Sequence, residues 1–116
     1  MNEHGLVHGL EDVYAAGDAT TFPIKQGGLA TQQADAVAEY IAAAVGAALE
    51  PKPFRPILRG LVLTGGRPEF LRAEIFRSSR RTSTAEPEAL WWPPAKIAGR
   101  YLGPFLAERA EFAYSY

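Results

Sequence analysis

Cysteine is absent from this sequence, so disulfides, thiolate metal sites, redox dithiols and a cysteine nucleophile are excluded within its 116 residues. Net charge is also small: 12 basic and 13 acidic side chains give −1, which argues against nucleic acid or an anionic membrane as the partner. No apolar run approaches ~20 residues and no secretory signal opens the chain, so we expect no membrane-spanning helix and a cytoplasmic location. The remaining composition, 47% hydrophobic and 22% charged, is typical of one globular domain or a piece of a larger protein.

The first half of the chain predicts a strand, a loop and a long helix. Residues 13–18 carry a β-branched residue, an aromatic residue and two alanines before a glycine, which predicts a short buried strand. Residues 20–28 contain a proline and a glycine pair and are expected to form a loop. Residues 29–49 predict a helix, because apolar residues recur there at three- and four-residue steps. These residues, expected to face the core, are Ala30, Ala34, Val37, Ala38, Ile41, Val45 and Ala48.

The end of that helix and the second half of the chain are predicted from glycine and proline. We expect Gly46 to be a mild defect inside the helix and Pro51 and Pro53 to end it. Apolar runs at 57–63 and 70–76, separated by Thr-Gly-Gly-Arg-Pro, predict an antiparallel hairpin. Residues 77–84 are expected to be a mobile loop, followed by a helix from Ala95 that kinks or restarts at Gly103-Pro104.

The segment around Gly17 and Asp18 has the order of elements that holds a cofactor. Open α/β sheets bind ligands beyond the carboxyl ends of their strands, where Gly17 permits a sharp turn. Asp18 then offers an acceptor to a ligand hydroxyl. The following helix directs its N-terminal N–H groups, equivalent to about half a positive charge, at the same place.

Residues 13–18, VYAAGD, followed by 25–34, KQGGLATQQA, resemble the second FAD motif of the FAD/NAD(P)-dependent pyridine nucleotide-disulfide oxidoreductase superfamily. The resemblance is to the branch of type II NADH:quinone and sulfide:quinone oxidoreductases. It covers residues 5–45, and beyond Pro51 it rests on the order of elements. In that family the aspartate hydrogen-bonds the ribityl chain of FAD, and the helix start lies against the flavin ring. The resemblance therefore implies these cofactor-binding residues: Gly17, Asp18, Lys25, Gly28, Leu29 and Ala30.

The same resemblance implies where an electron acceptor would bind. In quinone-reducing members, a glutamine-containing stretch at this helix start lines the quinone pocket, and here that place is occupied by Gln32 and Gln33. The disulfide-reductase branch is disfavoured because its C-terminal histidine is missing: the only histidines, His4 and His8, precede the aspartate and are expected to be exposed turn residues rather than metal ligands. The sulfide:quinone branch is disfavoured because cysteine is absent.

The family's first FAD fingerprint, Gly-x-Gly-x-x-Gly, and its second dinucleotide fold are both absent. We therefore expect an α+β fragment: residues 1–50 as the C-terminal part of a Rossmann-like FAD-binding domain, and 51–116 as a hairpin-and-helix domain. The expected function is the C-terminal portion of an FAD-dependent NAD(P)H oxidoreductase that passes electrons through flavin to a quinone or other acceptor. Its partners would be the missing N-terminal FAD and NAD(P) domains, and the chain alone is expected to be inactive and to bind FAD weakly.

Other readings of the sequence stay open at this point. A non-catalytic dimerisation or interaction module that keeps the ancestral fold is the alternative, with self-association through an uncovered apolar surface; a monooxygenase-like flavoprotein is a further one. The basic run Arg77, Arg80 and Arg81 is either a solvated loop or a site for phosphate, NADP or an acidic partner. A dense group of aromatic residues towards the C-terminus predicts a core or dimer contact, with peripheral membrane contact as the alternative: Trp91, Trp92, Phe105, Phe112, Tyr114 and Tyr116.

Overall fold

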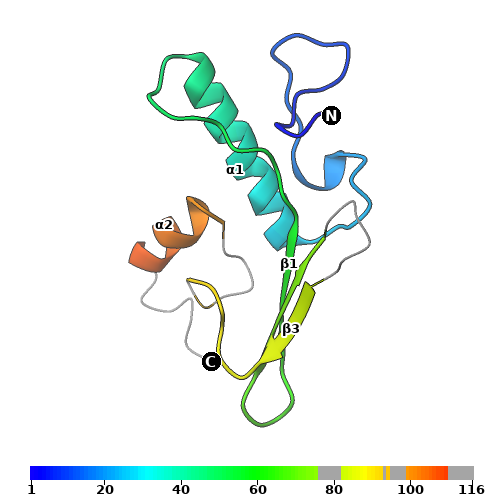
Figure 1. The fold of residues 1–116 in the computed structure, drawn as a ribbon, viewed down its shortest axis with the longest axis vertical. Coiled ribbons are helices and arrows are strands. Elements are labelled where there is room, and N and C mark those ends of the chain that lie inside the picture. Colours follow the sequence, from blue (N-terminus) through cyan, green and yellow to red (C-terminus); the bar gives the residue numbers. More distant parts are fainter. Residues whose placement is uncertain (76–81, 93, 95–98, 110–116) are drawn as a thin grey trace. The chain divides into compact units, whose positions relative to one another are not determined.

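The computed structural model describes residues 1–75, 82–92, 94 and 99–109. This part of the chain is an α+β protein with two α-helices and a three-stranded antiparallel sheet, which confirms the predicted class (Figure 1). The chain divides into two compact units, an N-terminal unit over Met1–Arg55 and a C-terminal unit over Pro56–Tyr116. The N-terminal unit contains a short 3-10 helix, η1 (Gly17–Ala19), and the long helix α1 (Gly27–Ala44).

The predicted buried strand over residues 13–18 does not form, and that prediction is wrong. Tyr14 makes an isolated antiparallel bridge with Leu6, flanked by hydrogen bonds from Val7 N to Val13 O and from Ala15 N to Gly5 O, each 2.8 Å long. Val13 is exposed, and residues 17–19 turn into η1. A buried strand requires pairing along its whole length and a covered face, whereas here the pairing is limited to the surroundings of Tyr14 and Val13 is left exposed.

Helix α1 begins two residues before the predicted start and ends five before the predicted end. Its end is set by Gly46, which has a φ of 101°. Gly46 N donates to Ala43 O at 3.1 Å and Ala47 N donates to Ala42 O at 2.9 Å, the two bonds of a Schellman motif. Gly46 therefore follows the C-cap residue Val45 and ends α1, rather than being a defect inside it, and the helix ends before Pro51 and Pro53 are reached.

The burial of α1 is the reverse of the predicted one along much of its length. Five of the seven members of the apolar stripe are exposed: Ala34, Ala38 and Ile41 on α1, and Val45 and Ala48 just beyond its end. The buried residues include several polar ones, among them Thr31, Gln33, Asp35 and Glu39. The segments of this unit that pack on α1 are loops and the three-residue η1, whose backbone groups need hydrogen-bond partners, so polar side chains face them.

Two loops of the N-terminal unit close on α1 and on each other. At the N-terminal loop, a Cβ on Gly5 would clash with Val37 Cγ2 and lie 3.0 Å from Ala15 O, and Gly5 has a φ of 83°. After α1, Lys52 N donates to Glu39 Oε2 at 2.8 Å, and Phe54 N donates to Glu3 O at 2.7 Å. The chain on both sides of α1 is thereby fixed to this helix or to the other loop.

An aromatic group joins the N-terminal loop to α1. The ring of His4 stacks on Tyr40 with centroids 5.0 Å apart, and Tyr14 lies 5.9 Å from Tyr40 in a tilted arrangement. His4 is in a turn as predicted, but its side chain is only 19% exposed rather than solvated. Partial burial, and after it the charge of Asp12 and the neighbouring Tyr40, raise the pKa of Tyr14 above its ordinary value.

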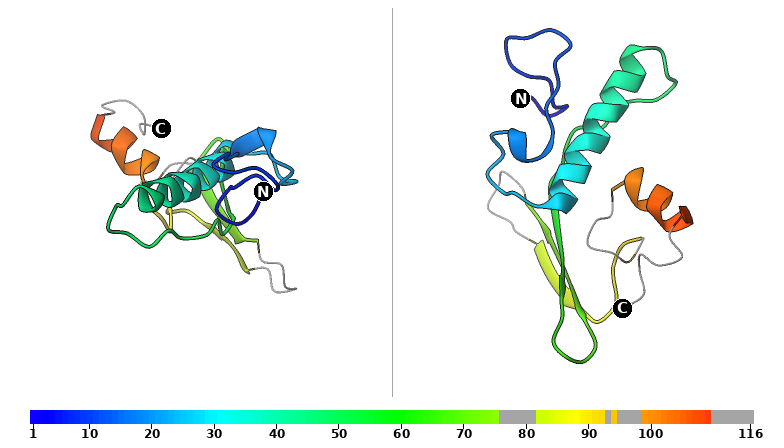
Figure 2. Two further views of the ribbon diagram at one scale, coloured as in Figure 1. Left: turned by 90° about the horizontal axis from the view of Figure 1, so that it is seen from above. Right: turned by 180° about the vertical axis from the view of Figure 1, so that it is seen from behind.

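The C-terminal unit contains the predicted hairpin and one strand more (Figure 2). Strands β1 (Ile57–Val62) and β2 (Glu69–Glu74) pair antiparallel around a turn in which Gly65 has a φ of 84°. Strand β3 (Thr82–Glu86) pairs with the other edge of β2. The expectation of a loop is therefore wrong for residues 82–84, while residues 77–81, with Arg77, Arg80 and Arg81, lie outside the described residues.

Helix α2 (Leu102–Arg109) follows in the same unit. The predicted start at Ala95 lies outside the described residues, and residues 99–101 are not helical. Gly103-Pro104 falls in the first turn of α2, where proline removes no hydrogen bond, so this pair lies at a helix start; whether a helix precedes it lies outside the described residues.

The predicted aromatic group is divided. Trp91 packs edge-on against the buried Phe70, with ring centroids 5.7 Å apart, and so belongs to a core. Trp92 is 73% exposed, and Phe105 on α2 is exposed as well. Phe112, Tyr114 and Tyr116 lie outside the described residues.

Candidate functional site

The candidate site is the turn at Gly17 and Asp18 in the N-terminal unit. Ala16 is extended, and Gly17 then takes a φ of 78°, a conformation that favours glycine. Thr20 closes the turn, since its backbone N and its Oγ1 both donate to Gly17 O, at 3.1 and 2.8 Å. The side chain of Asp18 is exposed at the middle of this turn.

Gln33 of α1 holds the turn against the helix. Its Oε1 accepts a 2.6 Å hydrogen bond from Gly17 N, and its Nε2 donates to Thr20 Oγ1 at 3.4 Å. The side chain is 3% exposed. The structure thus places Gln33, predicted to line an acceptor pocket, in a buried anchor whose amide is engaged at both ends.

Lys25 holds the same turn from the loop that follows it. Its Nζ donates to Thr20 O at 2.6 Å and to Asp18 O at 3.2 Å. These bonds give the carbonyl oxygens of Asp18 and Thr20 a hydrogen-bond donor, while Asp18 itself remains exposed. Lys25, Asp18 and Gly17 are therefore brought together, as the sequence predicted for one site, although Lys25 contacts the backbone of the turn.

The start of α1 is capped by a residue that the sequence did not single out. Gln26 is the N-cap, and its Oε1 accepts from Leu29 N at 3.2 Å, while Ala30 N donates to Gln26 O at 2.9 Å. The backbone amides of Leu29 and Ala30 were expected to donate to a cofactor, but both donate to Gln26 instead. The first-turn amides that precede these bonds belong to Gly27 and Gly28, of which Gly28 is buried.

The remaining predicted acceptor residue is Gln32, which is half-buried on α1 and lies one position before the anchor. The sequence missed Gln26 and Thr20, which fix the helix start and the turn. Glutamine is not among the residues that favour the N-cap position, so no local signal marks Gln26. Thr20 carried a weak signal, because threonine after a glycine turn commonly bonds a nearby carbonyl.

No family model matches the chain, and neither the curated proteins nor the solved structures include a match. Within the described residues, no helix combines the length and the apolar character needed to cross a bilayer. In the same part of the chain, no three histidine or acidic side chains gather into a group able to hold a metal ion. The geometry of the Gly17–Ala19 turn and of α1 is therefore the basis for a functional argument.

Proposed function

We propose that this chain is the C-terminal portion of an FAD-dependent NAD(P)H oxidoreductase, and that its N-terminal unit derives from a Rossmann-like FAD-binding domain. One observation supports this most strongly. The Asp18 carboxylate is exposed on a turn whose backbone is held from both sides, by Gln33 and by Lys25. Because the backbone of this turn is already held in place, a hydrogen bond from a ligand hydroxyl to the Asp18 carboxylate orders only the side chain and costs less conformational freedom than at a mobile loop.

The residues present fit FAD in part. Asp18 supplies the acceptor that the ribityl hydroxyls require, and the amides of Gly27 and Gly28 remain at the positive end of the α1 dipole. Leu29 and Ala30 do not fit the donor role, because their amides are engaged. When bound, FAD would take a hydride from NAD(P)H and pass electrons to a quinone or other acceptor. This chain's residues would bind and orient it.

The two glutamines take different roles in this proposal. Gln33 is a positioning residue, since it holds the amide of Gly17 and the hydroxyl of Thr20 and thereby sets where Asp18 points. Gln32, half-buried one position before Gln33, keeps the role that the resemblance implies, next to the electron acceptor.

The exposed apolar face of α1 supports the domain assignment. Ala34, Ala38, Ile41 and Val45 lie along one side of the helix, with no charged residue among them. Helices of α/β domains pack such faces on a sheet. We therefore assign this face to contact with the rest of the FAD domain. The same face favours the second candidate, a non-catalytic dimerisation or interaction module.

The visible absorption of the purified full-length protein tests the proposal. The expected result is a protein that retains flavin, and whose flavin content falls roughly tenfold or more in Asp18→Ala. The expected loss follows because a hydrogen bond to a charged group contributes about 1.5–3 kcal/mol. Asp12→Asn is the matched control: it removes another exposed carboxylate from a residue with positive φ, outside the turn, and should retain flavin.

Two results would overturn the proposal. One is a full-length protein without flavin, which would leave the interaction module. The other is equal flavin loss in the Asp18 and Asp12 variants, which would show that the turn carboxylate has no special role. Stopped-flow reduction with NADH, followed by quinone or oxygen, then separates a quinone reductase from a monooxygenase-like enzyme.

A further inference from the structure

The sheet of the C-terminal unit carries two arginines directly opposite each other. Arg59 on β1 pairs with Arg72 on β2, and Arg72 pairs with Thr84 on β3. Directly paired residues of an antiparallel sheet project from the same face, with Cβ atoms about 4.5–5.5 Å apart. Arg59, Arg72 and Thr84 therefore form one row of hydrogen-bond donors across all three strands.

The charge in this row is concentrated. Like charges directly opposite each other destabilise a sheet pair. Burial, and next the charge of Arg72, lower the pKa of Arg59. Arg72 Nη2 donates to Glu74 Oε1 at 2.5 Å in an ion pair, which engages one corner of a guanidinium that has five N–H donors. Glu86, at the exposed edge of the same face, is opposite Phe70 rather than Arg72.

Thr84 adds an independent observation that points to a ligand. Its Oγ1 is buried and has no hydrogen-bond partner. A buried hydroxyl without a partner costs free energy, so such groups in proteins normally meet an acceptor or water. This hydroxyl lies in the row beside Arg72, where it can donate to the same acceptor as the guanidinium.

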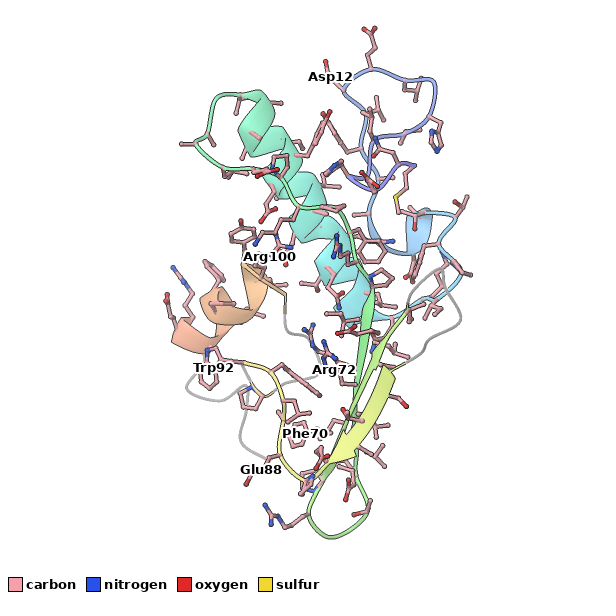
Figure 3. All side chains as sticks on the ribbon, in the orientation of Figure 1. Asp12, Phe70, Arg72, Glu88, Trp92 and Arg100 are labelled. Carbon is pink, nitrogen blue, oxygen red and sulfur yellow. The ribbon has the colours of Figure 1, made fainter. Side chains whose placement is uncertain are left out.

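Aromatic side chains border the row. The guanidinium carbon of Arg59 lies 5.8 Å from the ring centroid of Trp91, a cation–π contact, and Trp91 packs on Phe70. Figure 3 shows Phe70 and Arg72 projecting from the sheet toward the same side. Apolar rings beside charged donors exclude water and strengthen the interaction of those donors with an anion.

We propose that Arg59, Arg72 and Thr84 form a binding site for a phosphate group. Guanidinium forks match the oxygen atoms of a phosphate in pairs, and a hydroxyl supplies a further donor to the same group. A phosphate has enough oxygen atoms to use all three donors, whereas a carboxylate has two. The ligand class is thus a phosphate or a phosphate monoester. This site lies within the C-terminal unit and does not depend on the proposed flavin function.

The fluorescence of Trp91 reports directly on this site. In Trp92→Phe, which leaves Trp91 as the single tryptophan, sodium phosphate is titrated at constant ionic strength maintained with sodium chloride. We expect a saturable fluorescence change with a dissociation constant on the order of 1 mM. Thr84→Val in the same background should raise that constant roughly tenfold, because a hydrogen bond to a charged group is lost, and Thr84→Ser should restore it.

Three controls make the test specific. Thr84→Val should not lower the melting temperature without phosphate, because the hydroxyl makes no hydrogen bond there, whereas a structural role would lower it. Arg72→Ala should abolish saturation, and Arg67→Ala, which removes an exposed arginine of the hairpin turn, should not. If Arg72→Ala does not fold, the Thr84 pair still decides.

The proposal is overturned if phosphate produces no saturable change. It is also overturned if Arg67→Ala weakens binding as much as Arg72→Ala, since the attraction would then be nonspecific. A titration with sodium acetate that matches the phosphate curve would show a general carboxylate or anion site and would likewise contradict a phosphate site.

Discussion

Each of the two compact units is stabilised internally by a different kind of hydrogen bond. In the N-terminal unit, single polar side chains reach across the sequence to backbone groups: Gln33 binds Gly17 N, 16 residues away, and Glu39 binds Lys52 N, 13 residues away. In the C-terminal unit, backbone pairing along β1, β2 and β3 joins the strands. The first arrangement depends on a few individual side chains, whereas the second is spread over a whole ladder. A substitution in the N-terminal unit should therefore have the larger effect.

The largest effect is expected at Gly5. Gly5→Ala places a Cβ against Val37 and Ala15 O at a positive φ, so the free energy of unfolding should fall by about 2–4 kcal/mol in urea denaturation. Gly9→Ala is the matched control, because Gly9 has a φ of 80° and nothing within 4 Å, and should cost only about 1 kcal/mol. In a Val37→Ala background, the cost of Gly5→Ala should shrink. Equal costs at Gly5 and Gly9 would contradict the close contact with α1.

Gln33 gives the next effect. Gln33→Ala leaves Gly17 N without its acceptor and should lower the free energy of unfolding by about 1–3 kcal/mol. Hydrogen exchange at the Gly17 amide should accelerate by more than the global change accounts for. Gln32→Ala, at the neighbouring half-buried position, should cost less. If the two alanine variants unfold at the same urea concentration, the anchor does not hold the turn.

The smallest effects are expected from a pair of glycine substitutions, one in each unit. They test whether the two units differ in their side-chain hydrogen bonds and not in their backbone turns. Gly46 and Gly65 both have positive φ, and a Cβ added at either position would have no other atom within 4 Å. Gly46→Ala and Gly65→Ala should therefore each cost about 1 kcal/mol, although one caps α1 and the other lies in the hairpin turn. Differential scanning calorimetry of the two variants measures this. If the losses of unfolding free energy in the two variants differ by more than about 1 kcal/mol, the contrast between the units is not limited to side-chain anchors, because similar glycine turns would then differ in stability.

Local patterns predicted the elements better than they predicted burial. The hairpin and the body of α1 follow from period and turn chemistry in the sequence. The apolar stripe also lies on one side of α1, but Ile41 and Val45 are exposed because loops rather than a sheet pack on this helix. Strand β3 was missed because its sequence, TSTAE, is polar and shows no apolar alternation. The strand forms because it pairs with β2, and that pairing cannot be inferred from the residues of β3 alone.

The candidate site shows the same division. The sequence placed Gly17, Asp18 and Lys25 in one region, and the structure brings them together. The anchoring by Gln33 was beyond local reasoning, because it depends on how a turn docks on a helix 16 residues further along. The engaged amides of Leu29 and Ala30 were missed since the N-cap at Gln26 follows no common preference.

The backbone and the side chain of Asp18 have separate roles. Its carbonyl oxygen is tethered by the ammonium of Lys25, while its side chain extends into solvent and contributes nothing to holding the loop. Replacing the carboxylate, as in Asp18→Ala, should therefore leave the melting temperature of the protein unchanged. Any change in ligand binding caused by such a substitution can then be assigned to the lost carboxylate itself and not to a weakened fold.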